Sequence, residues 1–290
     1  MTQIAEDAQE AERSHPRLSV GSEEHKRLFC SVLLDTFDPY RPAVIDWPTL
    51  RADAHQRLVG LPIWDVAVET EENAGTRMQA MADATADPLV KKALALNAFE
   101  ERRHKDVLGH MMRFYGIALK GEIPAQPLPN PLWAFLRTGY GECFDSFFAF
   151  GLFEMARRSQ FFPPELVAVF EPVIQEEARH NLFFVNWVAY TRANLAWPRR
   201  FGFVVQCLAA LAVQIGKRMN TAKSVDGDNF TRKGNESLGI DLAPRSFLAL
   251  CLAENDRRLA GYDPRLLRPR IMPAVARLAM RLLPRRGAPL

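Results

Sequence analysis

Two five-residue stretches of the sequence combine carboxylates with an imidazole at the same spacing. Residues 100–104 read EERRH and residues 176–180 read EEARH, so both follow the pattern E-E-x-R-H. In each stretch a glutamate stands three residues before the histidine, and residues three apart are neighbours on one face of an α-helix. Each stretch can therefore present one carboxylate and one imidazole to the same point. These residues are Glu101 and His104 in the first copy, and Glu177 and His180 in the second.

Facing each other on two helices, the stretches would form a cage of oxygen and nitrogen donors. That ligand set is typical of a paired transition-metal site inside a bundle of helices. The alternative interpretation is two charged helix turns that face solvent. We favour the metal site because the residues flanking the Glu/His face are apolar in both copies. They include Leu94, Ala98 and Leu108 around the first, and Val173, Ile174 and Phe184 around the second.

The composition describes a globular protein with a sizeable core. The chain has 290 residues with 48% hydrophobic content, and its net charge of +3 gives no reason to expect a nucleic-acid partner. Four cysteines stand alone, without a C-x-x-C pair, which is typical of reduced thiols in a cytosolic protein. The polar N-terminus has no apolar segment of a secretory signal. We therefore expect a cytoplasmic location.

Apolar periodicity and turn signals predict an all-α chain whose central part, residues 60–195, contains four long helices. Asp87 is the expected N-cap of the second long helix, and Pro88 its first residue. The Gly/Pro-rich segment 120–130 is the expected crossover between two helix pairs. The four helices are expected at residues 62–84, 88–115, 131–160 and 164–193.

Further segments flank the four helices on both sides. Before them we expect a disordered tail at residues 1–22 and a helical extension at 23–59. After them, residues 196–290 form a second helical extension with a basic amphipathic tail. Its expected parts are an apolar helix at 201–219, a polar loop at 225–241 and a helix at 246–260. The longest apolar run, 201–216, has about the length of a buried helix and falls short of a membrane span.

The first long helix carries three glutamates that compete for a ligand role, and we choose Glu71. Only Glu71 lies within the apolar stripe, where an acid is costly unless it is paired or bound to metal. Glu69 lies on the polar face, and Glu72 is the second choice. Opposed residues of an antiparallel helix pair are equally far from the turn, so a turn at residue 86 places Glu71 level with Glu101.

On the third long helix two glutamates compete. Glu154 is followed by arginines three and four residues later, a pattern typical of a surface ion pair. Glu142 shares its stripe with small and apolar residues, including Gly139 and Ser146, which leave room for a metal ion. We choose Glu142 and keep Glu154 as the alternative.

The order Glu, Glu-x-x-His, Glu, Glu-x-x-His on four successive helices resembles the ferritin-like di-iron carboxylate superfamily over about residues 60–195. That superfamily includes ferritins, ribonucleotide reductase small subunits, bacterial multicomponent monooxygenases and acyl-carrier-protein desaturases. More narrowly, the chain is similar to bacterial ferritin-like domain proteins. The resemblance implies a ferritin-like four-helix bundle that binds two iron ions, or manganese with iron. The implied ligands are Glu71, Glu101, His104, Glu142, Glu177 and His180.

The resemblance also implies an arrangement of these ligands. Glu101 and Glu177 would bridge the two metal ions. Each histidine would donate its second ring nitrogen to an outer acceptor, for which Asp145, close to Glu142 in the sequence, is the candidate.

A pair of irons with an open position reacts with O2, which predicts an O2-dependent oxidase or oxygenase supplied by an electron donor protein or reductant. Aromatic residues near the motifs suggest a small apolar or aromatic substrate, although such residues form plain core by default. They are Phe147, Phe148, Phe150, Phe153, Phe183, Phe184 and Trp187.

Two other functions are compatible with the sequence. One is a ferroxidase or iron-handling protein, and the other is a non-catalytic helical binding module stabilised by metal. Segments before and after the four helices disfavour a closed storage shell, so we expect a monomer or homodimer. The C-terminal tail fits peripheral contact with a membrane surface or an anionic partner as well as it fits a helix packed on the bundle. Its arginines are Arg265, Arg268, Arg270, Arg277, Arg281, Arg285 and Arg286.

Overall fold

The computed structural model describes residues 18–118, 128, 130–223 and 244–283. Over these residues the protein is all-α, with nine α-helices, one short 3₁₀ helix and no strand. The expected tail before residue 18, most of the 120–130 crossover, the 225–241 loop and the last seven residues lie outside the described part. The flanking helices are α2 (Glu23–Leu34), η1 (Pro42–Val44), α3 (Ala52–Val59), α8 (Trp197–Lys223), α10 (Pro244–Leu259) and α11 (Ile271–Leu282).

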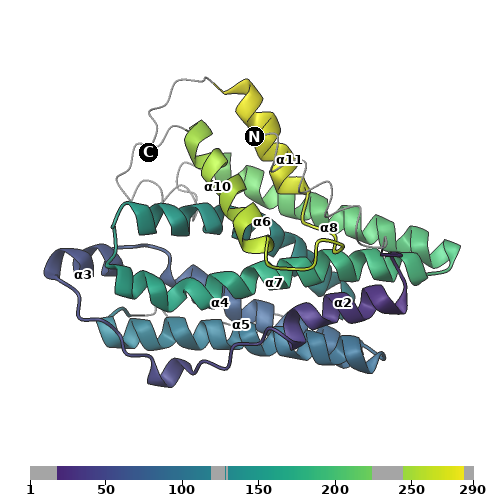
Figure 1. Cartoon of the computed structure of the whole chain (residues 1–290), viewed down its shortest axis with the longest axis horizontal. Helices are drawn as coiled ribbons and strands as arrows, with labels where there is room; N and C mark the ends of the chain where they lie inside the picture. Colours follow the sequence, from purple (N-terminus) through teal and green to yellow (C-terminus); the bar gives the residue numbers. More distant parts are fainter. Residues whose placement is uncertain (1–17, 119–127, 129, 224–243, 284–290) are drawn as a thin grey trace.

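Four long helices run along the long axis of the molecule (Figure 1). They are α4 (Trp64–Ala84), α5 (Pro88–Tyr115), α6 (Pro131–Arg158) and α7 (Pro164–Asn194). Each boundary lies within two residues of the sequence-based prediction. Helix α4 packs along α5, and α6 packs on both α4 and α7, which makes a bundle-like arrangement.

Local capping explains why these helices begin and end where they do. The Asp87 carboxylate accepts hydrogen bonds from the backbone amides of Leu89 and Val90, which confirms the predicted N-cap of α5. Asn130 does the same at the start of α6. Gly116 ends α5 in the left-handed conformation, with φ of 71°, which glycine adopts without strain.

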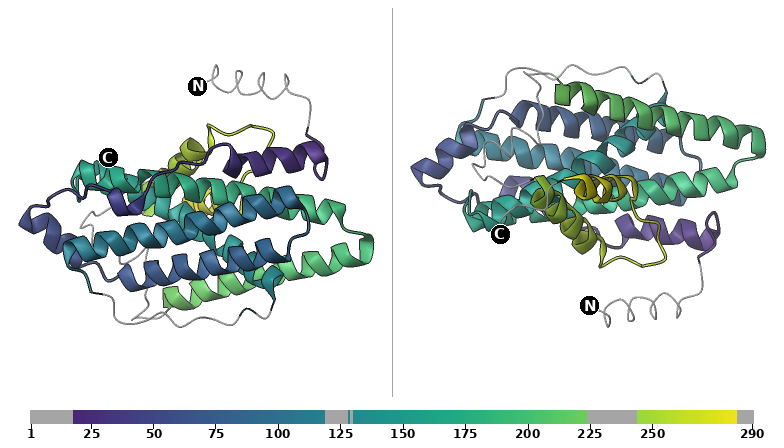
Figure 2. Two further views of the ribbon diagram at one scale, coloured as in Figure 1. Left: turned by 90° about the horizontal axis from the view of Figure 1, so that it is seen from below. Right: turned by 90° about the horizontal axis from the view of Figure 1, so that it is seen from above.

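Three of the flanking helices, α2, α8 and α10, share one core with the four long helices. Phe29 of α2, Phe183 of α7, Phe203 of α8 and Leu259 of α10 belong to the same buried apolar cluster. Helices α2 and α8 lie on opposite flanks of the long helices, and α10 and α11 cross over them on a third side (Figures 1 and 2). The extensions therefore enclose the central helices rather than forming separate units.

Helix α8 departs from the prediction. It is longer than expected, and only four residues between Trp197 and Met219 are buried: Phe203, Cys207, Ala210 and Gln214. Trp197–Met219 is the one stretch among the described helices that is long and apolar enough to cross a membrane. This stretch is longer than the apolar run 201–216, which was the segment expected to fall short of a membrane span.

A close contact joins α6 to α10. A Cβ atom on Gly151 of α6 would lie 2.3 Å from the Sγ of Cys251 and 3.2 Å from the Cα of Cys251. The thiol can rotate, but the main chain of α10 cannot move without disturbing its packing on α6 and α7.

We predict that Gly151→Ala lowers the free energy of unfolding by about 1–3 kcal/mol, because the added methyl overfills this contact. Gly109→Ala is the control: it also lies within a helix, and its Cβ would meet only the Arg113 side chain at 3.7 Å. That change should stabilise by about 0.5–1 kcal/mol through helix propensity. Urea unfolding followed by circular dichroism measures both. Equal stability of the two variants would contradict the close packing of α6 on α10.

Candidate metal centre

Side chains from three helices converge at the centre of the long helices. Glu71 of α4, Glu101 and His104 of α5, and Glu177 of α7 each place one ligand-type atom within 4.8 Å of the others. His104 Nδ1 lies 3.2 Å from a Glu177 oxygen and 3.4 Å from a Glu71 oxygen. His180 joins them, with its Nδ1 2.8 Å from Glu101 Oε1.

Glu142 brings the fourth long helix, α6, into the same cluster. Burial raises the pKa of its carboxyl well above the usual range, and repulsion from Glu101 and Glu177 raises it further. His180 opposes this shift, so the carboxyl interacts with both motif copies. The structure thus groups Glu71, Glu101, His104 and Glu177, with His180 against Glu101, and Glu142 of α6 interacts with this group through its charge.

The alternative glutamates have other partners. Glu72 forms an ion pair with Lys105, and Glu69 is exposed. Glu154 pairs with Arg157 and Arg158, as its spacing predicts. Its position on the surface was predicted wrongly, because the residue is only 2% exposed.

Each histidine of the cluster is held from behind by a carboxylate of the other motif copy. His104 Nε2 lies 2.8 Å from Glu176 Oε2, and His180 Nε2 lies 2.8 Å from Glu100 Oε2. A carboxylate accepts a hydrogen bond from an N–H group, so each Nε2 carries the proton. The Nδ1 atoms then direct their lone pairs toward the cluster, which is the tautomer that a metal ligand requires.

The arginine of each motif copy also binds the first glutamate of the other copy. Arg103 donates to Glu176 at 2.6 Å, and Arg179 donates to Glu100 at 2.7 Å. Both arginine side chains are only 3% exposed. Each copy therefore supplies the outer carboxylate and the cation that support the other copy, and this ties α5 to α7.

The same arginines hold the connection between α2 and η1. Arg103 donates to the main-chain carbonyls of Asp38 and Tyr40, and Arg179 donates to the carbonyl of Thr36. The guanidinium of Arg103 also lies 3.9 Å from the centre of the Tyr40 ring, within the range of a cation–π contact. Residues 36–40 are therefore held by the same two arginines that bind the outer glutamates, Glu176 and Glu100.

These outer residues were missed at the sequence level. The predicted outer acceptor, Asp145, is wrong, because its side chain is 68% exposed and pairs with Arg218 of α8. The motif itself contained the signal, because both copies repeat all four residues of E-E-x-R-H and not only the second glutamate and the histidine.

Four buried atoms that face the cluster make no hydrogen bond of acceptable geometry, although two of them, His180 Nδ1 and Glu101 Oε1, lie 2.8 Å apart. They are Glu101 Oε1, His104 Nδ1, Glu142 Oε1 and His180 Nδ1. A buried polar atom without a partner costs about 1–3 kcal/mol. Four such atoms in one place fit a site whose oxygens and nitrogens bind a cation.

The charges lead to the same conclusion. Burial raises the pKa of Glu71 to about 8, although the nearby His104 acts to lower it. Burial alone would lower the pKa values of His104 and His180, but the surrounding carboxylates outweigh it and raise both well above the usual range. Protons therefore supply positive charge here when no cation does. Four ionised carboxylates in this cluster carry four negative charges, which two divalent cations would balance.

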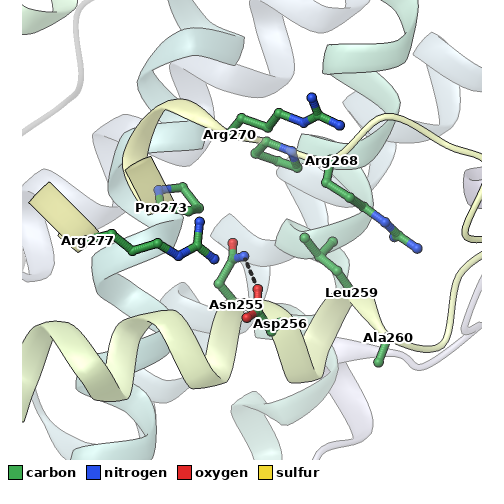
Figure 3. Close-up of a pocket in the computed structure, with 9 residues that line it drawn as sticks. Asn255, Asp256, Leu259, Ala260, Arg268, Arg270, Pro273 and Arg277 are labelled. Carbon is green, nitrogen blue, oxygen red and sulfur yellow. Dashed lines mark hydrogen bonds between the residues drawn. The ribbon is translucent and has the colours of Figure 1, made fainter. Parts of the chain in front are cut away.

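The cluster is enclosed but not sealed. The side chains of Glu71 and Glu177 are 19% and 15% exposed, whereas that of Glu101 is 2% exposed. A separate surface pocket of about 240 Å³ lies between α10 and the segment that leads into α11 (Figure 3). None of the six clustered residues lines it. The aromatic residues named as a substrate wall belong mostly to the buried apolar clusters.

No protein-family model matches the chain, and comparisons with curated proteins and with solved structures also give no match. The protein is therefore described by its fold and by the residues of its cluster. It is an all-α protein with a buried glutamate and histidine cluster at the centre of four long helices.

We predict that Arg103→Met lowers the free energy of unfolding of the metal-free protein by about 3 kcal/mol, because it removes the closest cation from the buried Glu176. Arg102→Met is the matched control, one residue earlier on the exposed side of α5, and should stay within about 0.5 kcal/mol of the wild type. Urea unfolding measures both. Two variants of equal stability would show that the exchanged pairs do not hold α5 and α7 together.

Proposed function

We propose that this protein is a ferritin-like dimetal oxidoreductase that uses O2 to oxidise or oxygenate a small apolar or aromatic substrate. The observation that carries this proposal is the convergence of Glu71, Glu101, His104 and Glu177 from three helices within 4.8 Å of one another, with His180 Nδ1 2.8 Å from Glu101. Buried atoms without a well-aligned hydrogen bond lie among them, including Glu142 Oε1 of the fourth helix. Donors of this kind are the ligands of non-haem di-iron centres in helical bundles.

The proposed metal ions are two irons, or manganese with iron. Their ligands are Glu71, Glu101, His104, Glu142, Glu177 and His180. Such a pair, when bound, supplies the electrons that reduce O2. The chain provides the two histidines in the ligand tautomer, because Glu100 and Glu176 accept the protons of their outer nitrogens.

Apolar side chains near the second motif fit an apolar substrate, because Phe184, four residues after His180, belongs to the buried apolar cluster. Phe184 of α7 lies so close to Gly139 of α6 that a Cβ atom there would be 2.2 Å from the ring. Ser146 adds one polar contact, with its hydroxyl 3.4 Å from Glu177. The partly exposed Glu71 and Glu177 provide the access that O2 requires, and turnover needs an external reductant.

The first test is metal content. Wild-type protein reconstituted with ferrous iron without oxygen should retain about two ions per chain, the capacity of a two-metal site. Glu101→Ala and Glu142→Ala should each lose at least one ion. Glu72→Ala is the control and should bind as the wild type does, because Glu72 pairs with Lys105. Elemental analysis after desalting gives the result, and a wild type that retains no metal would refute the proposal.

The second test distinguishes an oxygenase from a storage protein. With excess ferrous iron in air, an oxygenase centre oxidises only its own pair, so we expect oxidation to stop at about two irons per chain. Light scattering should show a monomer or dimer. Stopped-flow absorbance at rising ratios of iron to protein measures the limit. Continued oxidation of many irons per chain, in a particle of many subunits, would instead establish iron storage.

A further inference from the structure

Helix α8 has two different faces. The inner face packs on the body of the protein through four buried residues at helical spacing. They are Phe203, Cys207, Ala210 and Gln214, which are 4%, 8%, 0% and 8% exposed. Such a stripe is what an amphipathic helix buries against a core.

The outer face of α8 is also apolar, yet it is exposed along the whole described helix. An exposed apolar surface of this extent marks a site of interaction with a protein or a membrane. Its large residues are Trp197 (79% exposed), Phe201 (67%), Val205 (48%), Leu208 (61%), Val213 (41%), Ile215 (40%) and Met219 (53%).

Hydrogen bonds fix α8 lengthwise on α6. Gln214 donates to the carbonyl of Arg137, and Arg218 donates to the carbonyl of Gly141 and to Asp145. A helix held in this way lies on the surface of the protein, along one flank of the molecule (Figure 2). Its exposed face is therefore available to a planar partner without the helix leaving the fold.

The charges of α8 are of one sign. Residues 197–223 contain no aspartate or glutamate. Exposed Arg199 and Arg200 lie at its beginning, and exposed Lys217 lies near its end. Cations at both ends of an apolar face are complementary to a layer of anionic headgroups over acyl chains.

We propose that the outer face of α8 binds the surface of an anionic lipid membrane. The helix lies in the plane of the headgroups, with Phe201, Val205 and Leu208 in contact with the acyl chains. Trp197 lies at the level of the headgroups, where the amphipathic indole ring is favoured. The proposed binding site is thus α8, a different element from the C-terminal tail that the sequence singled out.

A second copy of this chain is a less suitable partner. In a symmetric dimer formed through this face, α8 would meet α8. Antiparallel helices would place Arg199 and Arg200 against Lys217 of the other copy, and parallel helices would place the arginines against each other. Since α8 has no acidic residue, like charges would face one another in either case.

The test uses vesicles of equal parts phosphatidylcholine and phosphatidylglycerol, with the full chain and sedimentation as the assay. Phe201→Gln with Leu208→Gln should lower binding at least roughly tenfold, because two apolar side chains leave the acyl region. Phe114→Gln with Val66→Gln is the matched control, since both residues are exposed and apolar but lie on α5 and α4. The control should bind as the wild type does.

Charge and depth provide two further measurements. Arg199→Gln with Lys217→Gln should weaken binding to the anionic vesicles by about fivefold for each charge, and should leave binding to pure phosphatidylcholine unchanged. Brominated lipids should quench the fluorescence of the wild type. They should quench Trp197→Phe less, because Trp197 is on the outer face of α8, whereas Trp187, which contacts α8 through Phe203, is buried on its inner side.

Four results would overturn the proposal. In the first, the wild type does not bind the anionic vesicles. In the second, the α8 double variant (Phe201→Gln with Leu208→Gln) binds as well as its control. Leu278→Gln with Leu282→Gln on α11 alone abolishes binding, which would assign the contact to the C-terminal tail. Light scattering finds a dimer that the α8 pair disperses, without vesicle binding. The assay needs no bound metal, so its failure is separate from failure of the proposed oxidoreductase.

Discussion

Carboxylates that meet inside an apolar interior repel one another unless positive charge lies among them, and this constraint explains the arrangement at the centre of the protein. When all four carboxylates are ionised, the inner ring of Glu71, Glu101, Glu142 and Glu177 holds more negative charge than its two histidines can balance. The outer ring is balanced, because each glutamate has an arginine as a close partner. The excess is thus confined to the inner ring, which is where a pair of divalent cations would neutralise it.

The crossed contacts between the two motif copies also fix the position of α5 relative to α7. The carboxylate behind His104 comes from α7, and the one behind His180 comes from α5. A shift of one helix along the other would break both pairs at once. The inner residues are therefore positioned by charged contacts rather than by apolar packing alone, which tolerates small displacements more readily.

Much of the fold and part of the cluster could be predicted from the sequence. Prolines and caps such as Asp87 defined the ends of the long helices, and the apolar stripe selected Glu71 from its neighbours. The outer acceptors could not be predicted in the same way, because Glu176 and Glu100 are 72 and 80 residues from the histidines they hold. Asp145 was chosen for proximity in the sequence. Hydropathy also does not reveal which apolar side of α8 remains uncovered.

The contacts of Arg103 and Arg179 with residues 36–40 have a consequence for sequence variation. The arginines bind mainly carbonyl oxygens of the main chain, which every amino acid possesses. Replacement of Asp38 by another residue would leave its carbonyl in place. Thr36 and Tyr40 differ from Asp38 in this respect, because their side chains also contact Arg179 and Arg103. Substitution is therefore expected to be tolerated more readily at Asp38 than at Thr36 or Tyr40.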